Sequence, residues 1–198
     1  MATPARNMGQ KAKRVRATTK PTETQEYYMR IAHAVRLRAS CDKRLVGAVL
    51  VLGNRIISTG YNGTPEGMDN CNQGGCHRCA NPDLYPSGEG YDVCICVHAE
   101  QNALLTAARF GIGVEDADIY STLAPCFTCM KELLQARVKN VYFLGEFRKY
   151  DNDLDLQVQR LVAKFRGRGK CQRLIVPGVD PDLSREALEA AKVAGYDG

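Results

Sequence analysis

The chain has 198 residues, of which 44% are hydrophobic and 25% are charged, and its mean hydropathy is −0.31. This composition is typical of one globular domain with or without tails, and it excludes a fibrous or wholly disordered chain. The net charge of +5 arises from residues 1–20, where basic side chains have no acidic counterpart. The rest of the chain is nearly neutral, so binding to duplex DNA is not favoured.

Residues 1–21 are expected to form a disordered basic tail. An amphipathic helix is predicted over residues 22–39. Two apolar runs follow, 46–52 and 55–60, and they are joined by Gly53-Asn54, where both residues tolerate positive φ. This pattern predicts a β-hairpin.

The next stretch, residues 62–97, is rich in glycine and cysteine and poor in aliphatic residues. It predicts a loop, and a loop of this length inside a compact domain requires something to order it. The later elements alternate between helix and strand. They are helices at 99–110, 126–136 and 154–166, strands at 118–122, 138–144 and 172–176, and a terminal helix after Ser184 within 181–198.

This order predicts a three-layer α/β/α domain over residues 22–180, with a mixed, largely parallel sheet covered by helices on both faces. No apolar run approaches the length that crosses a bilayer, and the N-terminus lacks the apolar core of an export signal. We therefore expect a cytoplasmic protein with no membrane contact.

The nine cysteines point to metal rather than to disulfides. Their number is odd, and seven of them fall between residues 71 and 129. In a chain without an export signal, clustered cysteines usually bind metal, and zinc is the first expectation.

Two short motifs carry the chemistry: H-x-E at His98 and Glu100, and P-C-x-x-C at Cys126 and Cys129. One imidazole and two thiolates leave the fourth zinc position open for water, as in catalytic sites. Glu100 can reach that water and transfer its proton. Redox use of the two cysteines leaves His98 and Glu100 unexplained, and a purely structural zinc normally has four protein ligands.

H-x-E followed by P-C-x-x-C is the signature of zinc nucleobase deaminases. Several further segments make the chain resemble the deoxycytidylate (dCMP) deaminase family. These segments are Arg38-Ala39-Ser40-Cys41, Val46-Gly47-Ala48-Val49, Gly60-Tyr61-Asn62-Gly63-Thr64-Pro65-Glu66-Gly67, Asn70-Cys71, and His98-Ala99-Glu100-Gln101-Asn102-Ala103.

The resemblance implies the cytidine-deaminase fold, with a central five-stranded mixed sheet, and a homo-oligomer, with a hexamer favoured. It implies deamination of dCMP to dUMP and ammonia, which supplies dUMP for dTMP synthesis. Zinc-activated water attacks ring C4 while Glu100 moves protons to N3 and to the departing amine. It also implies activation by dCTP and inhibition by dTTP, with Mg²⁺.

The resemblance assigns the substrate contacts as well. Asn62 holds the sugar, the backbone at Ala99 reads the pyrimidine edge, and Arg109 and Tyr150 contact the nucleotide and its phosphate. An exposed helix charge is the alternative interpretation of Arg109. Lys43 and Arg44 are other candidates for phosphate contacts, with a solvated loop as their alternative. The effector site would include Tyr61, Asn62 and Gly63, a segment that can also be read as a tight turn.

A second, structural zinc is also expected from the resemblance, because several family members carry one. Its predicted ligands are Cys41, Cys71, Cys79 and Cys96. By sequence alone, Cys76, His77 and Cys94 are equally well placed. Cys171 is expected to be a small buried apolar residue.

Two other functions compete with this interpretation. A deaminase of tRNA or single-stranded DNA needs stacking surfaces, and this chain has no Trp and only 7% aromatic residues. Nucleic acid is therefore not the expected partner. A non-catalytic zinc scaffold has no use for a carboxylate aimed at the open zinc position, so Glu100 argues against it.

Overall fold

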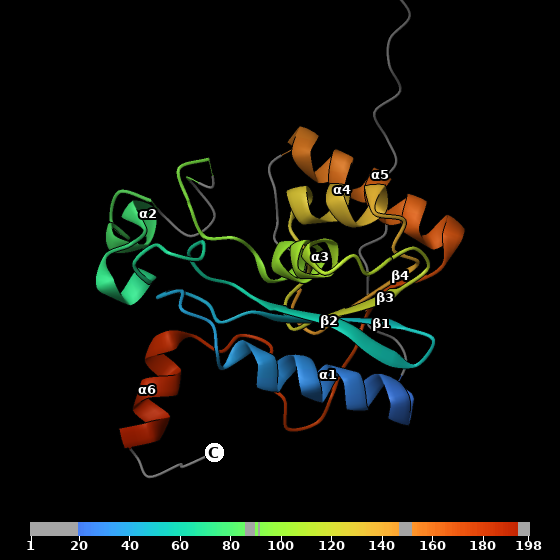
Figure 1. The fold of residues 1–198 in the computed structure, drawn as a ribbon, viewed down its shortest axis with the longest axis horizontal. Helices are drawn as coiled ribbons and strands as arrows, with labels where there is room; N and C mark the ends of the chain where they lie inside the picture. The colour runs from blue at the N-terminus through green and yellow to red at the C-terminus, as the bar shows by residue number, and fades with distance from the viewer. Residues whose placement is uncertain (1–19, 86–89, 91, 147–151, 194–198) are drawn as a thin grey trace, which may run out of the picture.

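The computed structural model describes residues 20–85, 90, 92–146 and 152–193 (Figure 1). The predicted order of helices and strands is confirmed, and two short helices, η1 and α2, are added within 62–97, where a loop alone was predicted. The elements are α1 (Glu23–Arg36), β1 (Gly47–Leu52), β2 (Arg55–Tyr61), η1 (Cys71–Gln73), α2 (His77–Ala80), α3 (Ala99–Arg109), β3 (Asp118–Ser121), α4 (Phe127–Gln135), β4 (Asn140–Phe143), α5 (Asn152–Arg168), β5 (Cys171–Arg173) and α6 (Arg185–Val193).

The five strands form one mixed sheet in the order β2-β1-β3-β4-β5. β1 is antiparallel to both β2 and β3, whereas β3, β4 and β5 are parallel. The predicted mixed sheet is confirmed: β1 alone runs against the other four strands, so two of the four strand pairings are antiparallel and two are parallel. The antiparallel pairings come from the hairpin. The crossover through α3 connects β2 to β3, and β1, the first strand of the hairpin, lies between these two strands.

Alternating side chains on the strands build a core on each face of the sheet. Ala48 and Leu50 pack under the helices α3, α4 and α5. Val49 and Val51 point the other way and pack against α1. Figure 1 shows α1 on one side of the sheet and α3, α4 and α5 on the other, which confirms the three-layer architecture.

Local sequence fixes the hairpin turn and the seat of α3. Gly53 and Asn54 have φ values of 56° and 59°, the left-handed pair that a two-residue hairpin requires. At Gly60 a Cβ atom would overlap the backbone of Ala99 and Ala103. The absence of a side chain therefore lets the start of α3 rest directly on β2.

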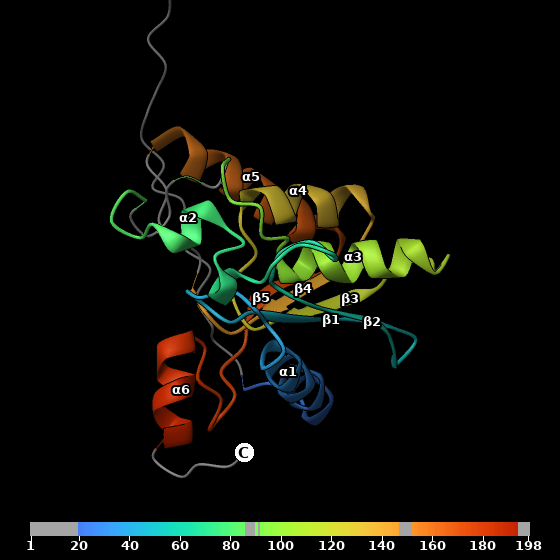
Figure 2. The same cartoon turned by 60° about the vertical axis from the view of Figure 1, so that its left-hand side comes forward.

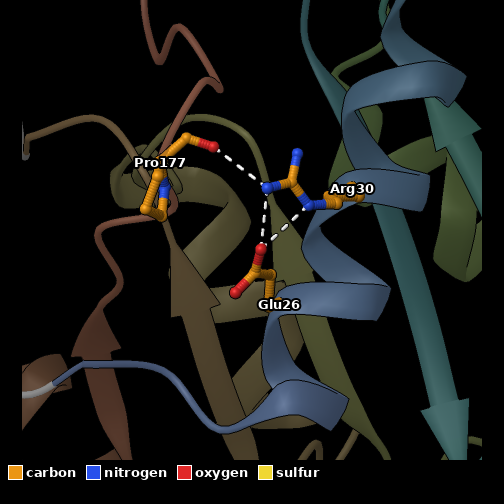
Figure 3. Close-up of polar contacts among 3 residues, drawn as sticks. All are labelled: Glu26, Arg30 and Pro177. Carbon is orange, nitrogen blue, oxygen red and sulfur yellow. Dashed lines mark hydrogen bonds and ion pairs between the residues drawn. The ribbon is translucent and has the colours of Figure 1, made fainter.

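Residues 177–185, which we call the C-terminal strap, return across the end of α1. Arg30 donates to Glu26 at 2.7 Å and to the Pro177 carbonyl at 3.0 Å (Figure 3). The Leu45 amide donates to the Leu183 carbonyl at 3.0 Å. Figure 2 shows α6 below the sheet, beside the end of α1. The predicted helix after Ser184 is therefore present, and it is held to the domain by the strap.

None of the described helices combines the length and the apolar character that a membrane crossing needs.

Candidate active site

Three metal-ligand side chains meet where α3 and α4 begin. His98 and Cys126 are the N-cap residues of these two helices, and Cys129 lies one turn into α4. His98 Nδ1 is 3.4 Å from each of the two sulfurs, which are 3.5 Å from each other. Zinc bonds of about 2.0–2.3 Å give tetrahedral edges of about 3.6–3.8 Å. The donors therefore fit a zinc ion that is open on its fourth side.

The charges of the three donors also suit a metal. The neighbouring Cys129 thiol and the His98 ring hold the pKa of Cys126 at about 4, well below that of a free thiol. Burial opposes the charged imidazolium, but contact with the Cys126 thiolate prevails and raises the pKa of His98 to about 9. Both pKa shifts favour a thiolate beside an imidazolium when no metal is bound, and metal binding would release the imidazolium proton.

Glu100 lies beside this centre, in the first turn of α3. It is only 3% exposed, and its Oε1 accepts a hydrogen bond from Ser121 Oγ at 2.9 Å. Burial raises the pKa of Glu100. A buried carboxyl group with a raised pKa is suited to taking and returning a proton.

A side-chain bridge connects the two helices that present the donors. The Gln101 side chain accepts from the His98 amide at 2.9 Å and donates to Glu132, on α4, at 3.0 Å. The relative placement of His98 and the cysteines is therefore fixed by hydrogen bonds as well as by packing.

The centre opens into a cavity of about 620 Å³. His98, Glu100 and Cys126 lie in its wall. Besides Glu100, its charged lining residues are Lys43, Arg44, Arg78, Glu146, Arg173 and Asp182. All of these except the buried Arg78 are partly or fully exposed, and we call them the rim. Arg44 pairs with Asp182 at 3.2 Å, and Arg173 pairs with Glu146 at 2.5 Å.

Sequence reasoning missed Arg78, Arg173 and Ser121. Arg173 ends β5 and Ser121 ends β3, so both lie at carboxyl ends of parallel strands, where α/β sheets usually bind ligands. The same rule could have been applied to the strands predicted from the sequence. Arg78 carries no comparable signal, because it lies in a stretch without periodicity.

The proposed substrate residues fall in different places. Asn62 lines the cavity, and its amide accepts from the Val46 N–H and donates to the Arg44 carbonyl, both at 2.8 Å. Ala99 is fully buried at the start of α3. Arg109 is at the other end of α3, mostly exposed and paired with Glu66 at 2.9 Å, so the structure does not bring it to the cavity. Tyr150 lies outside the described residues.

The candidate effector segment, Tyr61 to Gly63, lies next to the backbone that precedes His98. Tyr61 is partly exposed, and its carbonyl accepts from Asn102 at 2.6 Å. Gly63 exchanges two backbone hydrogen bonds with Val97. The segment thereby holds the backbone that leads into His98.

The four predicted ligands of the second zinc lie together, with all their sulfurs within 4.8 Å of one another. A second set consists of Cys76, Cys79, Cys94 and Cys96. His77 is exposed and bonds to Asn81 instead. Cys171 is buried in the main core.

Comparison with known proteins agrees with this geometry. The profile described as the cytidine and deoxycytidylate deaminase zinc-binding region matches residues 22–145. The deoxycytidylate deaminase of Schizosaccharomyces pombe is 47% identical over 117 residues, which cover 59% of this chain and 35% of that protein. That of Saccharomyces cerevisiae is 40% identical over 122 residues, 62% of this chain and 38% of that protein. The chain thus spans little more than a third of either relative.

Among solved structures, the dCMP deaminase of the cyanophage S-TIM5 in complex with dCMP and dUMP is 29% identical and gives a TM-score of 0.57. The match covers 79% of this chain and 100% of that chain. It confirms the predicted α/β fold. Because the family profile spans more than half of the sequence and includes His98, Glu100, Cys126 and Cys129, this chain belongs to the cytidine and deoxycytidylate deaminase family.

Proposed function

We propose that the chain catalyses the hydrolytic deamination of dCMP to dUMP and ammonia. The observation that carries the proposal is the buried Glu100 carboxyl beside a three-donor centre in the wall of a cavity with a basic rim. The names of the two yeast relatives and the dCMP and dUMP complex of the cyanophage protein support dCMP as substrate.

His98, Cys126 and Cys129 would hold the catalytic zinc, which when bound acts as a Lewis acid that activates water for attack on ring C4. Glu100 takes a proton from the water and delivers it to N3, and then passes a proton to the amine, which leaves as ammonia. Ser121 holds the carboxyl in place by donating to Oε1. Burial of Glu100 keeps bulk water from competing for the proton.

The rim of the cavity supports a nucleotide rather than a nucleoside. Arg44 and Arg173 are paired with carboxylates that are themselves exposed. A phosphate dianion can replace these carboxylates and accept from the same guanidinium groups. Lys43 and Arg78 add positive charge to the same cavity. Because Arg109 lies away from the cavity, we assign the phosphate to these cationic residues.

Regulation, assembly and cellular role are parts of the same proposal that rest on the family resemblance. We propose activation by dCTP and inhibition by dTTP, with Mg²⁺, through Tyr61, Asn62 and Gly63, in a homo-oligomer of six chains that supplies dUMP for dTMP synthesis. None of the nine cysteines, all of which lie among the described residues, forms a disulfide, which suits the reducing cytoplasm. An activity that does not respond to dCTP or dTTP would remove the regulatory part.

The first experiment is ammonia release from dCMP, with dCTP, deoxycytidine, CMP and a tRNA hairpin assayed in parallel. Turnover confined to dCMP supports the proposal. Activity on the hairpin without activity on dCMP would instead identify a polynucleotide deaminase. Inactivity on every substrate by the zinc-loaded protein would indicate a scaffold.

A further inference from the structure

Six cysteines gather at the end of the molecule where η1 and α2 lie, and we call this group the six-cysteine cluster. Its members are Cys41, Cys71, Cys76, Cys79, Cys94 and Cys96. All are buried except Cys94, which is half-buried. The sulfurs form two sets of four, and in each set they lie within 4.8 Å of one another. Cys79 and Cys96 belong to both sets, so the sets share an edge.

The spacing of the sulfurs has the dimensions of thiolate coordination. Zinc–sulfur bonds of about 2.3 Å place the sulfurs of a tetrahedron about 3.8 Å apart. The Cys41 and Cys79 sulfurs are 3.9 Å apart in the first set, and those of Cys76 and Cys94 are 3.9 Å apart in the second. The Cys71 and Cys96 sulfurs are closer, at 3.0 Å, so a bound ion would require these two to separate slightly. With that adjustment each set can hold one zinc ion.

We propose that the six-cysteine cluster binds two zinc ions, each with four thiolates, and that Cys79 and Cys96 bridge them. A single ion in either set would leave two of the six cysteines without metal, packed against the bound thiolates. With a second divalent ion, every sulfur binds metal. The second ion replaces the protons of the two thiols that a single ion would leave unbound, so the formal charge of the buried cluster does not increase.

The surroundings of the cluster explain why this stretch needs metal. Among the described residues, the apolar side chains that pack together in this part of the molecule are cysteines only, and the other buried side chain of α2 is the charged Arg78. No apolar core is available to order η1 and α2, so metal bonds would supply the folding energy. Cys96 precedes His98 by two residues, and Cys94 and Cys96 line the cavity. The pair of ions would therefore also fix one wall of the cavity.

Zinc content of the purified full chain, measured by native mass spectrometry, tests the proposal. We expect three ions per chain: two in the cluster and one at His98, Cys126 and Cys129. Cys94→Ser should lower the count to two, or to one if losing one ion releases the other. Cys171→Ser is the matched control, because it removes a buried cysteine outside the cluster, and it should keep three ions. A wild-type count of two that Cys94→Ser leaves unchanged overturns the proposal.

His98→Ala separates this inference from the proposed deamination. It removes a donor from the three-ligand centre alone, so turnover and one ion should be lost while two ions remain in the cluster. If the wild type holds three ions but does not deaminate dCMP, the proposed function fails and the two-ion cluster stands.

A second measurement uses only the wild type and does not depend on how a variant folds. The chain is purified from cells supplied with ¹¹³Cd and examined by cadmium NMR. Two thiolate-only resonances that are coupled to each other through the bridging sulfurs support the proposal. A single thiolate-only resonance, or two without mutual coupling, contradicts it.

Discussion

At the scale of single residues, Glu100 is in a position that costs stability. Its carboxyl is almost fully buried, and burial raises its pKa. A buried acid destabilises a fold unless its partners compensate, and here Ser121 donates to it. A neutral amide of the same shape would cost less to bury but could not transfer a proton. The proposed proton transfer therefore accounts for a carboxyl group at this buried position, whereas packing does not.

Glu100→Gln tests this explanation. We expect kcat to fall by about 10³-fold because the general acid–base group is lost. Zinc content should not change, and the unfolding temperature at pH 7 should stay equal or rise, because the amide can still accept from Ser121. Glu186→Gln, at an exposed position on α6, is the control. Wild-type turnover in Glu100→Gln would contradict the proposed mechanism.

The buried thiol of Cys171 should make the stability of the fold depend on pH. Burial raises the pKa of this thiol from 9.0 to about 12. The folded chain thus keeps a proton that the unfolded chain releases, so the free energy of unfolding falls as pH rises through 9. At pH 10 the loss is about 1.4 kcal/mol.

Cys171→Val should remove this part of the pH dependence, because valine is similar in size and does not ionise. Urea unfolding at pH 8 and pH 10 gives the comparison. The wild type should lose more stability than the variant between these two values. Equal losses would show that the thiol is not protected in the fold.

At the scale of elements, the site depends on how α3 and α4 are aligned. Each helix begins directly after a candidate metal donor, and α3 packs against β2 at Gly60. The Gln101–Glu132 bridge then connects the two helices beside the donors. The relative placement of the three donors is therefore set by β2, by the starts of α3 and α4, and by one hydrogen bond. None of these contacts involves a donor atom.

Gln101→Ala should weaken binding at the three-ligand centre. Residues that orient metal ligands typically contribute about 10- to 100-fold in affinity. We expect the zinc affinity of this centre to fall by about 10-fold, measured by competition with a chelator. Gln135→Ala, at an exposed position on α4, should leave the affinity unchanged. An unchanged affinity in Gln101→Ala would show that packing alone positions the donors.

At the scale of the whole molecule, the C-terminal strap completes the cavity. Pro181 and Asp182 line it, Asp182 pairs with Arg44, and Leu183 is bonded to Leu45. None of these strap residues touches the three-donor centre or Glu100 in the hydrogen bonds described. The strap should therefore affect substrate binding more than the chemical step.

A chain ending at Val179 loses the backbone hydrogen bond between Leu45 and Leu183, which holds the segment that carries Lys43 and Arg44 at the cavity. We expect the KM for dCMP to rise by about 10-fold, with a smaller change in kcat. Steady-state kinetics on the shortened chain provide the measurement. A chain ending at Val193 retains the strap and α6 and is the control. If KM rises and kcat falls by the same factor in the shorter chain, the strap also supports the catalytic centre.

Local patterns explain what the sequence could predict. The hairpin turn is encoded by the adjacent residues Gly53 and Asn54, and each group of donors lies within a few residues of the helix start that the local sequence predicts. The position of β1 between β2 and β3 depends on long-range pairing, and the grouping of Arg173 with the donors depends on that sheet order. The sharing of Cys79 and Cys96 between two sets arises in a stretch without hydrophobic periodicity, so no spacing rule reveals it.

The cavity combines two separate parts of the sequence. The three candidate donors and Glu100 lie within residues 22–145, which the family profile covers, whereas Arg173, Pro181 and Asp182 lie beyond it. Under the proposed function, mutations in the later stretch would change which nucleotide is accepted and leave the proton-transfer residues in place. Substrate preference could then diverge during evolution while the reaction stays the same, and a designer could use the same division.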